Sequence, residues 1–229
     1  MYYWLKLLAV AFLNLLIGYN GFSQSTYRLK ADITIKVKNI DSTFQFTKGR
    51  VFYDQNAKKI VYDIVFPAKQ LFVSHDTLLY RFVNDTLRST TWSPLKPEFS
   101  VFHFILNEQL VDYGLKSSRF FISDIEKGSG LIVTTWSPPE GIDSPVGNIY
   151  ISTKEKKLFA VLIHNSEGQL LSRQIYKKYI YLNGVNIPTE ILSVSYIQGQ
   201  KMYQIIQFEN IVLNEEGNNN MYDYPIYKN

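Results

Sequence analysis

Residues Phe44–Leu87, FQFTKGRVFYDQNAKKIVYDIVFPAKQLFVSHDTLLYRFVNDTL, decide the fold of this chain. The run is typical of five short strands joined by turns, and these strands carry apolar side chains on both faces. In residues 59–66, one face holds Ile60, Tyr62, Ile64 and Phe66. The other face holds Val61 and Val65 beside Asp63. A sheet with water on one side needs only one apolar face, so the second face must be covered by protein or by an apolar ligand.

Similar strand patterns extend in both directions. Residues 27–38 alternate without a fault, with Leu29, Ala31, Ile33 and Ile35 on one face. Gly49 inside the next strand indicates a bulge or a close backbone approach. The other predicted strands are 43–54, 59–66, 70–74, 78–83, 87–92, 118–126, 130–136, 148–152, 158–164, 170–181, 187–196, 202–208 and 211–213. We therefore predict a mainly β fold, a strongly curved antiparallel sheet or unclosed β-barrel of about a dozen strands.

One segment has a different pattern. Residues 98–110, EFSVFHFILNEQL, carry apolar side chains at helical spacing after Pro97. We predict one amphipathic helix here, which could cover a face of the sheet as a lid. The domain organisation is then a signal peptide at 1–24, a single curved β domain at 25–214 and a polar tail at 215–229. We expect this tail to be mobile unless its tyrosines dock on the sheet.

The first residues, MYYWLKLLAVAFLNLLIGYNGFSQS, have the pattern of a secretory signal peptide, with cleavage after Gln24. The alternative is a membrane anchor, but the apolar core of about 11 residues is shorter than the roughly 20 that a spanning helix needs. The absence of Cys excludes disulfides, thiolate metal sites and an acylated N-terminal Cys. The near balance of 24 basic and 20 acidic residues, without a basic cluster, argues against nucleic-acid binding. We expect an exported, periplasmic protein.

No motif predicts catalysis. His75, His103 and His164 are isolated in sequence, and no metal-binding, phosphate-binding or nucleophile motif occurs. Four acids could pair in space, namely Asp63, Asp76, Asp85 and Asp112. Without a sign of such a pair, we predict no catalytic residue, no metal and no cofactor. Trp92 and Trp136 both precede Ser-Pro at strand ends, and we expect them at the rim of the sheet.

The order of these features resembles the periplasmic outer-membrane lipoprotein carriers of the LolA/LolB type. Gly49 opens a strand, the strand from Ile60 ends at Phe66–Pro67, and LFVSHDTLLYRFVND and a helix near Phe99–Leu106 follow as in that family. The chain lacks the long first helix of the family, and it reads DQNAKK where the carrier has an Arg-Pro pair. The resemblance implies an unclosed β-barrel with a helical lid as the fold. It implies a lipid-binding chaperone for lipoprotein transport in outer membrane biogenesis as the function. It also implies an inner-membrane donor and an outer-membrane acceptor as partners.

The leading hypothesis is therefore a carrier or binding protein for lipoproteins or other acylated ligands, which we expect to be monomeric. Each buried methylene contributes about 0.8 kcal/mol, so acyl chains could bind without directed contacts. The predicted cavity residues are Ile60, Tyr62, Ile64, Phe66, Phe72, Leu78, Tyr80, Phe82, Phe99, Phe102, Ile105 and Leu106. The simplest alternative is a closed core that leaves no room for a ligand. A further alternative is an envelope scaffold that binds protein partners through its sheet and aromatic rim.

Overall fold

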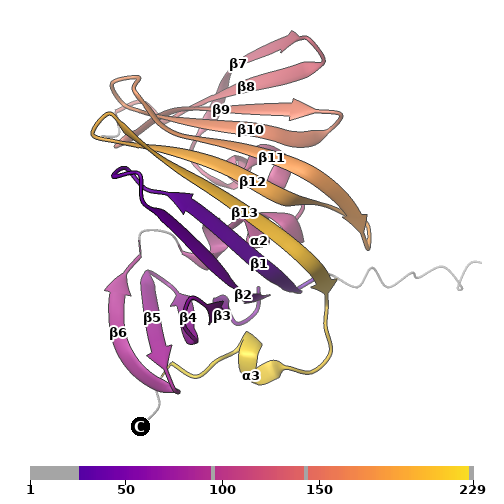
Figure 1. Cartoon of the computed structure of the whole chain (residues 1–229). Helices are drawn as coiled ribbons and strands as arrows, with labels where there is room; N and C mark the ends of the chain where they lie inside the picture. The colour runs from indigo at the N-terminus through magenta and orange to yellow at the C-terminus, as the bar shows by residue number, and fades with distance from the viewer. Residues whose placement is uncertain (1–25, 94–95, 142–143, 227–229) are drawn as a thin grey trace, which may run out of the picture.

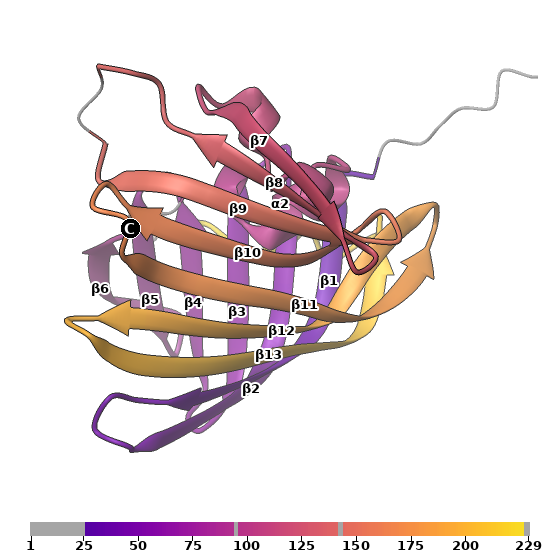
Figure 2. The same cartoon turned by 90° about the horizontal axis from the view of Figure 1, so that it is seen from above.

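The computed structural model describes residues 26–93, 96–141 and 144–226. The predicted signal peptide lies outside these residues, as do the last three residues of the chain. Within the described ranges the chain forms a single antiparallel sheet of thirteen strands, which is curved into an unclosed half-barrel (Figures 1 and 2). The predicted fold class is confirmed.

The strands follow each other along the sheet except at one point. The first six are β1 (Arg28–Lys38), β2 (Phe44–Asp54), β3 (Lys59–Phe66), β4 (Gln70–His75), β5 (Leu78–Val83) and β6 (Thr86–Trp92). The other seven are β7 (Phe121–Gly128), β8 (Leu131–Ser137), β9 (Val146–Lys154), β10 (Lys157–Asn165), β11 (Leu170–Leu182), β12 (Val185–Ile197) and β13 (Gln200–Leu213). β1 pairs with β13, so β6 and β7 form the two edges of the sheet.

The segment between β6 and β7 must cross from one edge of the sheet to the other. It does so inside the curve, where the helix α2 (Val101–Leu106) lies between the two halves of the sheet (Figure 2). Four short helices form this segment: η1 (Pro97–Phe99), α2 (Val101–Leu106), η2 (Leu110–Asp112) and η3 (Leu115–Ser117). We call the segment, residues 96–118, the helical cover.

The predicted helix over 98–110 was too long. Ser100 has an extended backbone, and its Oγ accepts a hydrogen bond from the backbone N–H of His103, which caps α2 at its first residue. Glu108 lies in the left-handed region, with φ of 56°, and this ends the helix soon after Leu106. The apolar spacing was correct, because Phe102, Phe104, Ile105 and Leu106 are all buried.

The helical cover packs on the inner face of the sheet. The alternation predicted for β1 is confirmed, since Leu29, Ala31 and Ile33 are buried there. Strands from both halves contribute the rest of this inner core. Its members in other strands include Val51, Tyr53, Ile60, Ile64, Ile149, Ile151, Leu158, Val161, Ile187, Ile191 and Phe208.

The C-terminal residues cover part of the outer face. β13 leads into residues 214–226, which contain α3 (Asn219–Tyr222) and run beneath β2 and β3 in Figure 1. Tyr222, Tyr224 and Ile226 are buried against a second core cluster. The sheet residues of this cluster are Phe52, Val61, Val73, Tyr80 and Phe82. The tail that was expected to be mobile thus docks through its tyrosines.

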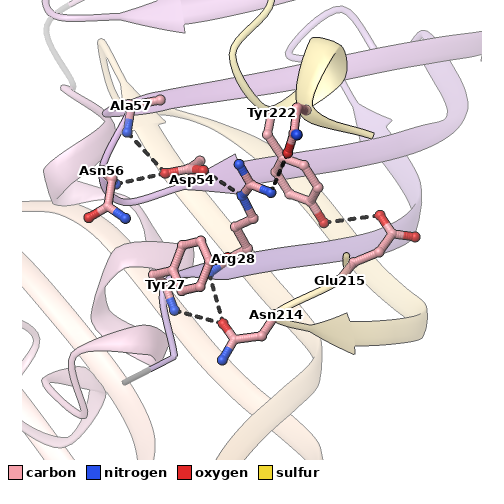
Figure 3. Close-up of polar contacts among 9 residues, drawn as sticks. Tyr27, Arg28, Asp54, Asn56, Ala57, Asn214, Glu215 and Tyr222 are labelled. Atoms are coloured by element: carbon pink, nitrogen blue, oxygen red, sulfur yellow. Dashed lines mark hydrogen bonds and ion pairs between the residues drawn. The ribbon is translucent and has the colours of Figure 1, made fainter. Parts of the chain in front are cut away.

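An arginine fixes this tail to the sheet (Figure 3). Arg28 Nε donates to Asp54 Oδ2 at 2.6 Å, and Arg28 Nη1 donates to Asn219 Oδ1 at 2.7 Å. The guanidinium lies 4.6 Å from the centre of the Tyr222 ring, and the Tyr222 hydroxyl donates to Glu215 at 3.2 Å. Buried charges need such partners, and Asp54 also accepts two backbone N–H groups.

Gly49 lies at a close backbone approach, as its sequence position indicated. The β2–β3 register shifts between Lys48 and Gly49. A Cβ at Gly49 would lie 2.4 Å from the carbonyl oxygen of Asp63 and 2.9 Å from Cα of Ile64. Only glycine fits there without moving β3.

We therefore expect Gly49→Ala to destabilise the protein by about 1–3 kcal/mol, the usual cost of overpacking. Chemical denaturation followed by circular dichroism measures this difference. Gly128→Ala is the control, because no atom lies within 4 Å of its added Cβ. Equal stability of the two variants would contradict the assigned register.

Candidate ligand-binding cavity

A cavity of about 340 Å³ lies between the helical cover and the inner face of the sheet. The cover contributes Phe99, Ser100, Val101, Phe102 and Tyr113 to its wall. The sheet side is formed by strands β1, β3, β11, β12 and β13. Their lining residues are Ile33, Ile35, Tyr62, Gln174, Tyr176, Ile191, Ser193, Gln204, Ile206 and Phe208.

The floor of the cavity is apolar because the strands are in register. Ile35 of β1 faces Ile206 of β13, and Ile206 faces Ile191 of β12. Side chains of such cross-strand partners lie on one face of a sheet, so these three form a continuous apolar surface. Phe102 of α2 closes one side, where its ring lies 5.6 Å from that of Phe208.

A small polar cluster lies in the same wall. The hydroxyl groups of Tyr113 and Tyr176 both donate to Gln174 Oε1, at 3.0 and 2.5 Å. Tyr113 reaches this point from the end of η2, where it has a left-handed backbone. The two hydroxyls therefore fix the orientation of the Gln174 amide.

The tyrosines of the cavity stay protonated at neutral pH. Burial raises the pKa of Tyr62 to about 12. Burial also raises the pKa of Tyr113, and it raises that of Tyr176 well above the ordinary value of 10. Among the described residues that line the cavity, none carries a formal charge. The wall can thus offer apolar contact and neutral hydrogen bonds.

A polar contact beside the cavity joins α2 of the helical cover to the sheet. The Tyr53 hydroxyl of β2 lies 2.8 Å from His103 Nδ1 of α2. The Tyr53 ring also packs against Phe102, with 6.3 Å between ring centres. Phe99 of η1 lines the cavity although 59% of its surface is exposed, so it lies at the mouth.

Three of the predicted cavity residues line this cavity: Tyr62, Phe99 and Phe102. Five others belong to the inner core or pack against it. These are Ile60, Ile64, Phe72, Ile105 and Leu106. The predicted face of β3 therefore points inward, as does the buried face of α2.

The remaining four predicted cavity residues lie elsewhere. Leu78, Tyr80 and Phe82 are on the outer face, in the cluster beneath the C-terminal tail. The β4–β5 register explains this, because Phe72 faces Arg81, so the alternate residues of β5 point outward. Phe66 is about half exposed and contacts Phe46.

The two tryptophans differ from each other. Trp92 ends the edge strand β6 and is 71% exposed. Trp136 near the end of β8 is buried in the inner core, so it was wrongly expected at the rim. The position of Trp136 at the end of a strand, just before a loop that contains proline, gave no sign of this burial.

Most of the cavity wall was missed from sequence. The alternation of residues 27–38 correctly placed Ile33 and Ile35 on one face of their strand. This alternation was the only sequence signal for the cavity wall outside the predicted residues. Gln174, Ile191 and Ile206 come from the C-terminal strands. Their position depends on the pairing of β1 with β13, which no local pattern reveals.

Within residues 26–93, 96–141 and 144–226, no three His, Asp or Glu side chains are grouped to hold a metal ion. In the same residues, no helix has the length and apolar character needed to cross a membrane.

Solved structures share the overall fold of this chain. A LolA superfamily protein from Nitrosomonas europaea matches with a TM-score of 0.56 at 11% identity, over 87% of this chain and 91% of its own. A putative outer membrane lipoprotein-sorting protein domain from Vibrio parahaemolyticus gives 0.60 at 14% identity, over 85% and 89%. This chain has a LolA-like fold.

A DUF1329 family protein from Desulfovibrio piger has the same LolA-like fold, with a TM-score of 0.59 at 10% identity over 88% of this chain and 91% of its own. No family model and no curated protein matches the sequence. The likeness is thus one of backbone architecture, and the chemistry of the site must come from this chain's own residues.

The Tyr53–His103 contact predicts a pH dependence. Burial lowers the pKa of His103, with Glu98 opposing and Lys58 adding to this shift. Near pH 6 the unfolded chain therefore binds more protons than the folded protein. The contribution of His103 to stability is complete above its pKa in the unfolded chain, and it is lost as the pH falls through its lower pKa in the folded protein.

We expect the melting temperature to fall by a few degrees from pH 7.5 to pH 5.5 in the native protein. His103→Gln should reduce that fall, because glutamine does not titrate. Differential scanning calorimetry at both pH values measures this. An unchanged difference between the two pH values in the variant would show that other groups cause it.

Proposed function

We propose that this protein is a periplasmic carrier or binding protein for lipoproteins or other acylated ligands. The observation that carries this proposal is the apolar, uncharged cavity beneath the helical cover. The LolA-like fold supports it, because two of the similar structures are described as a LolA superfamily protein and a lipoprotein-sorting domain. The signal-peptide pattern supports export.

The binding would depend mainly on apolar burial. Ile33, Ile35, Ile191 and Ile206 present apolar surface, and each methylene transferred from water contributes about 0.8 kcal/mol. A chain of roughly ten methylenes would gain about 8 kcal/mol before the costs of ordering the ligand and loss of its free motion. No catalytic group is needed for such a role.

Release of the ligand would involve the helical cover. The cover is made of short helices, and its segment between β6 and β7 is joined to the two unpaired edges of the sheet. A shift of α2 away from Phe208 would open the cavity without breaking a strand pair. We expect a monomer that receives its ligand from an inner-membrane donor and passes it to an outer-membrane acceptor.

The alternative scaffold function would be favoured by a tightly filled interior and an exposed aromatic patch. The 340 Å³ cavity argues against the first condition. Exposed aromatic side chains do occur, and Trp92 is one. Because ligand binding would use this cavity and a scaffold function would not, we favour ligand binding.

A variant that fills the cavity tests the proposal. Ile206→Trp places a large ring in the cavity and should weaken binding of the uncharged fluorescent probe N-phenyl-1-naphthylamine at least tenfold. Ile205→Trp is the matched control, because it lies next in the same strand on the opposite face and should bind as the native protein does.

Probe titration gives the dissociation constants, and circular dichroism confirms that both variants fold. Native mass spectrometry of the protein from its host should also find lipid or acylated peptide that copurifies. A native protein that carries no lipid and does not bind the probe would overturn the proposed function.

A further inference from the structure

We propose that the cavity selects an acyl chain bearing an uncharged carbonyl group, such as an ester or amide, over a chain with a charged head group. This inference rests on the proposed function and names the ligand class more narrowly. It follows from the volume of the cavity, from its hydrogen-bond donors and from the absence of charge among its lining residues.

The cavity is large enough for an acyl chain. A methylene group fills roughly the volume that a water molecule occupies in the liquid, about 30 Å³. The 340 Å³ cavity therefore has room for at least about ten methylene-sized groups.

The polar wall offers hydrogen-bond donors. Gln174 Oε1 already accepts hydrogen bonds from Tyr113 and Tyr176. Its amide nitrogen carries two N–H groups, which are without a protein partner in the described part of the chain. The Tyr62 hydroxyl likewise has none there, and its raised pKa keeps its proton. These groups fit an acceptor such as a carbonyl oxygen.

The same wall disfavours a charged head group. No lysine or arginine lines the described cavity, so a carboxylate or phosphate would lose its hydration without gaining a counter-charge. An ester or amide carbonyl loses much less hydration and gains hydrogen bonds from Gln174 and Tyr62. A charged group on the same ligand would have to remain outside the mouth at Phe99.

Competition with N-phenyl-1-naphthylamine tests this selectivity. Methyl decanoate should displace the probe about three to ten times more effectively than undecane, the range expected for one neutral hydrogen bond. Decanoate at pH 8 should compete more weakly than the ester. In Gln174→Leu and in Tyr62→Phe, the advantage of the ester over the alkane should shrink.

Gln200→Leu, in the hairpin between β12 and β13, is the control and should keep the full advantage. Tyr62→Phe keeps the tyrosine–glutamine cluster intact and covers the case in which Gln174→Leu fails to fold. If the probe and both single-chain compounds fail to bind, the proposed function falls. If the chains bind but the ester and alkane compete equally, or decanoate competes best, only this inference falls.

A separate observation concerns the outer face of the same strands. We infer that the outer face near the β1–β2 and β12–β13 hairpins docks on an anionic membrane surface. Figure 2 shows these two hairpins at the same end of the molecule. The inference depends on the pattern of side chains there and not on the cavity.

Lysines and aromatic rings alternate on this outer face. One cross-strand row runs from Phe44 through Lys38 to Tyr203, and the next contains Phe46 and Lys36. We call this surface, with Lys48, Phe66, Tyr196 and Lys201, the lysine–aromatic patch. Its members Phe44, Phe46, Phe66 and Tyr203 are all exposed, and Phe44 is 78% exposed.

Each of three lysines in the patch lies over a ring. The Nζ atoms of Lys38, Lys48 and Lys201 are 5.9, 5.4 and 5.8 Å from the ring centres of Phe44, Phe46 and Tyr196. The adjoining hairpin turn contains one acidic residue, Asp41, whose side chain accepts hydrogen bonds from Thr43. This arrangement suits a membrane surface. The rings can enter the lipid interface while the lysines reach anionic head groups.

The patch would bring the cavity close to the lipid. Ile35 of the cavity wall is next to Lys36 in β1, and Gln204 is next to Tyr203 in β13. The two surfaces are thus opposite sides of the same strands. A protein that exchanges acyl chains with a membrane would benefit from such a contact.

Cosedimentation with vesicles tests this second inference. The native protein should bind vesicles of phosphatidylcholine with phosphatidylglycerol more strongly than phosphatidylcholine alone, and added salt should reduce binding. Changing Lys38, Lys48 and Lys201 to Gln should weaken binding roughly a hundredfold, since each lysine near an anionic surface contributes about fivefold. Phe44→Ser should also weaken it.

Phe121→Ser on the distant edge strand β7 is the control, because Phe121 is also an exposed phenylalanine but lies outside the patch. It should leave vesicle binding unchanged. Equal binding to both kinds of vesicle, or an equal loss in the Phe121→Ser control, would overturn the inference. Probe binding to the cavity should be unaffected by Phe44→Ser, which separates this test from the first.

Discussion

The pairing of the first strand with the last is the constraint on which the rest of the structure depends. Because β1 and β13 are neighbours, the middle of the chain begins at one edge of the sheet and resumes at the other. The connection can remain short only by crossing the inside of the curve. This crossing places Phe102 and Ile105 against the inner face and leaves a cavity beside them.

The two faces of the N-terminal strands are partly covered, each by a different part of the chain. The helical cover lies on the inner face, and the C-terminal tail lies on the outer one, held by Arg28 and Tyr222. The apolar residues on the outer face of β3–β5 are therefore explained by their packing against the C-terminal tail. On the inner side the covering is incomplete, and this is why the proposed ligand site lies beside β1, β11 and β13.

The chemistry of the cavity follows from where its polar residues lie. Tyr113 comes from the cover and Gln174 from β11, so the polar cluster joins two elements that are 61 residues apart in sequence. Buried tyrosines keep their protons and a glutamine keeps no charge, so the cluster adds hydrogen bonds without the cost of burying an ion. An apolar cavity can thereby distinguish ligands by a neutral group.

The sequence by itself determined the strands, the curved antiparallel fold and the inward face of β1, because side-chain alternation is a local property of a strand. It also determined that α2 has a buried face and that Gly49 lies at a close approach. The tertiary structure alone decided which strands share the cavity and that Leu78, Tyr80 and Phe82 point outward under the tail. Strand order and cross-strand register join residues far apart in the chain, and a shift of one residue in register exchanges the two faces.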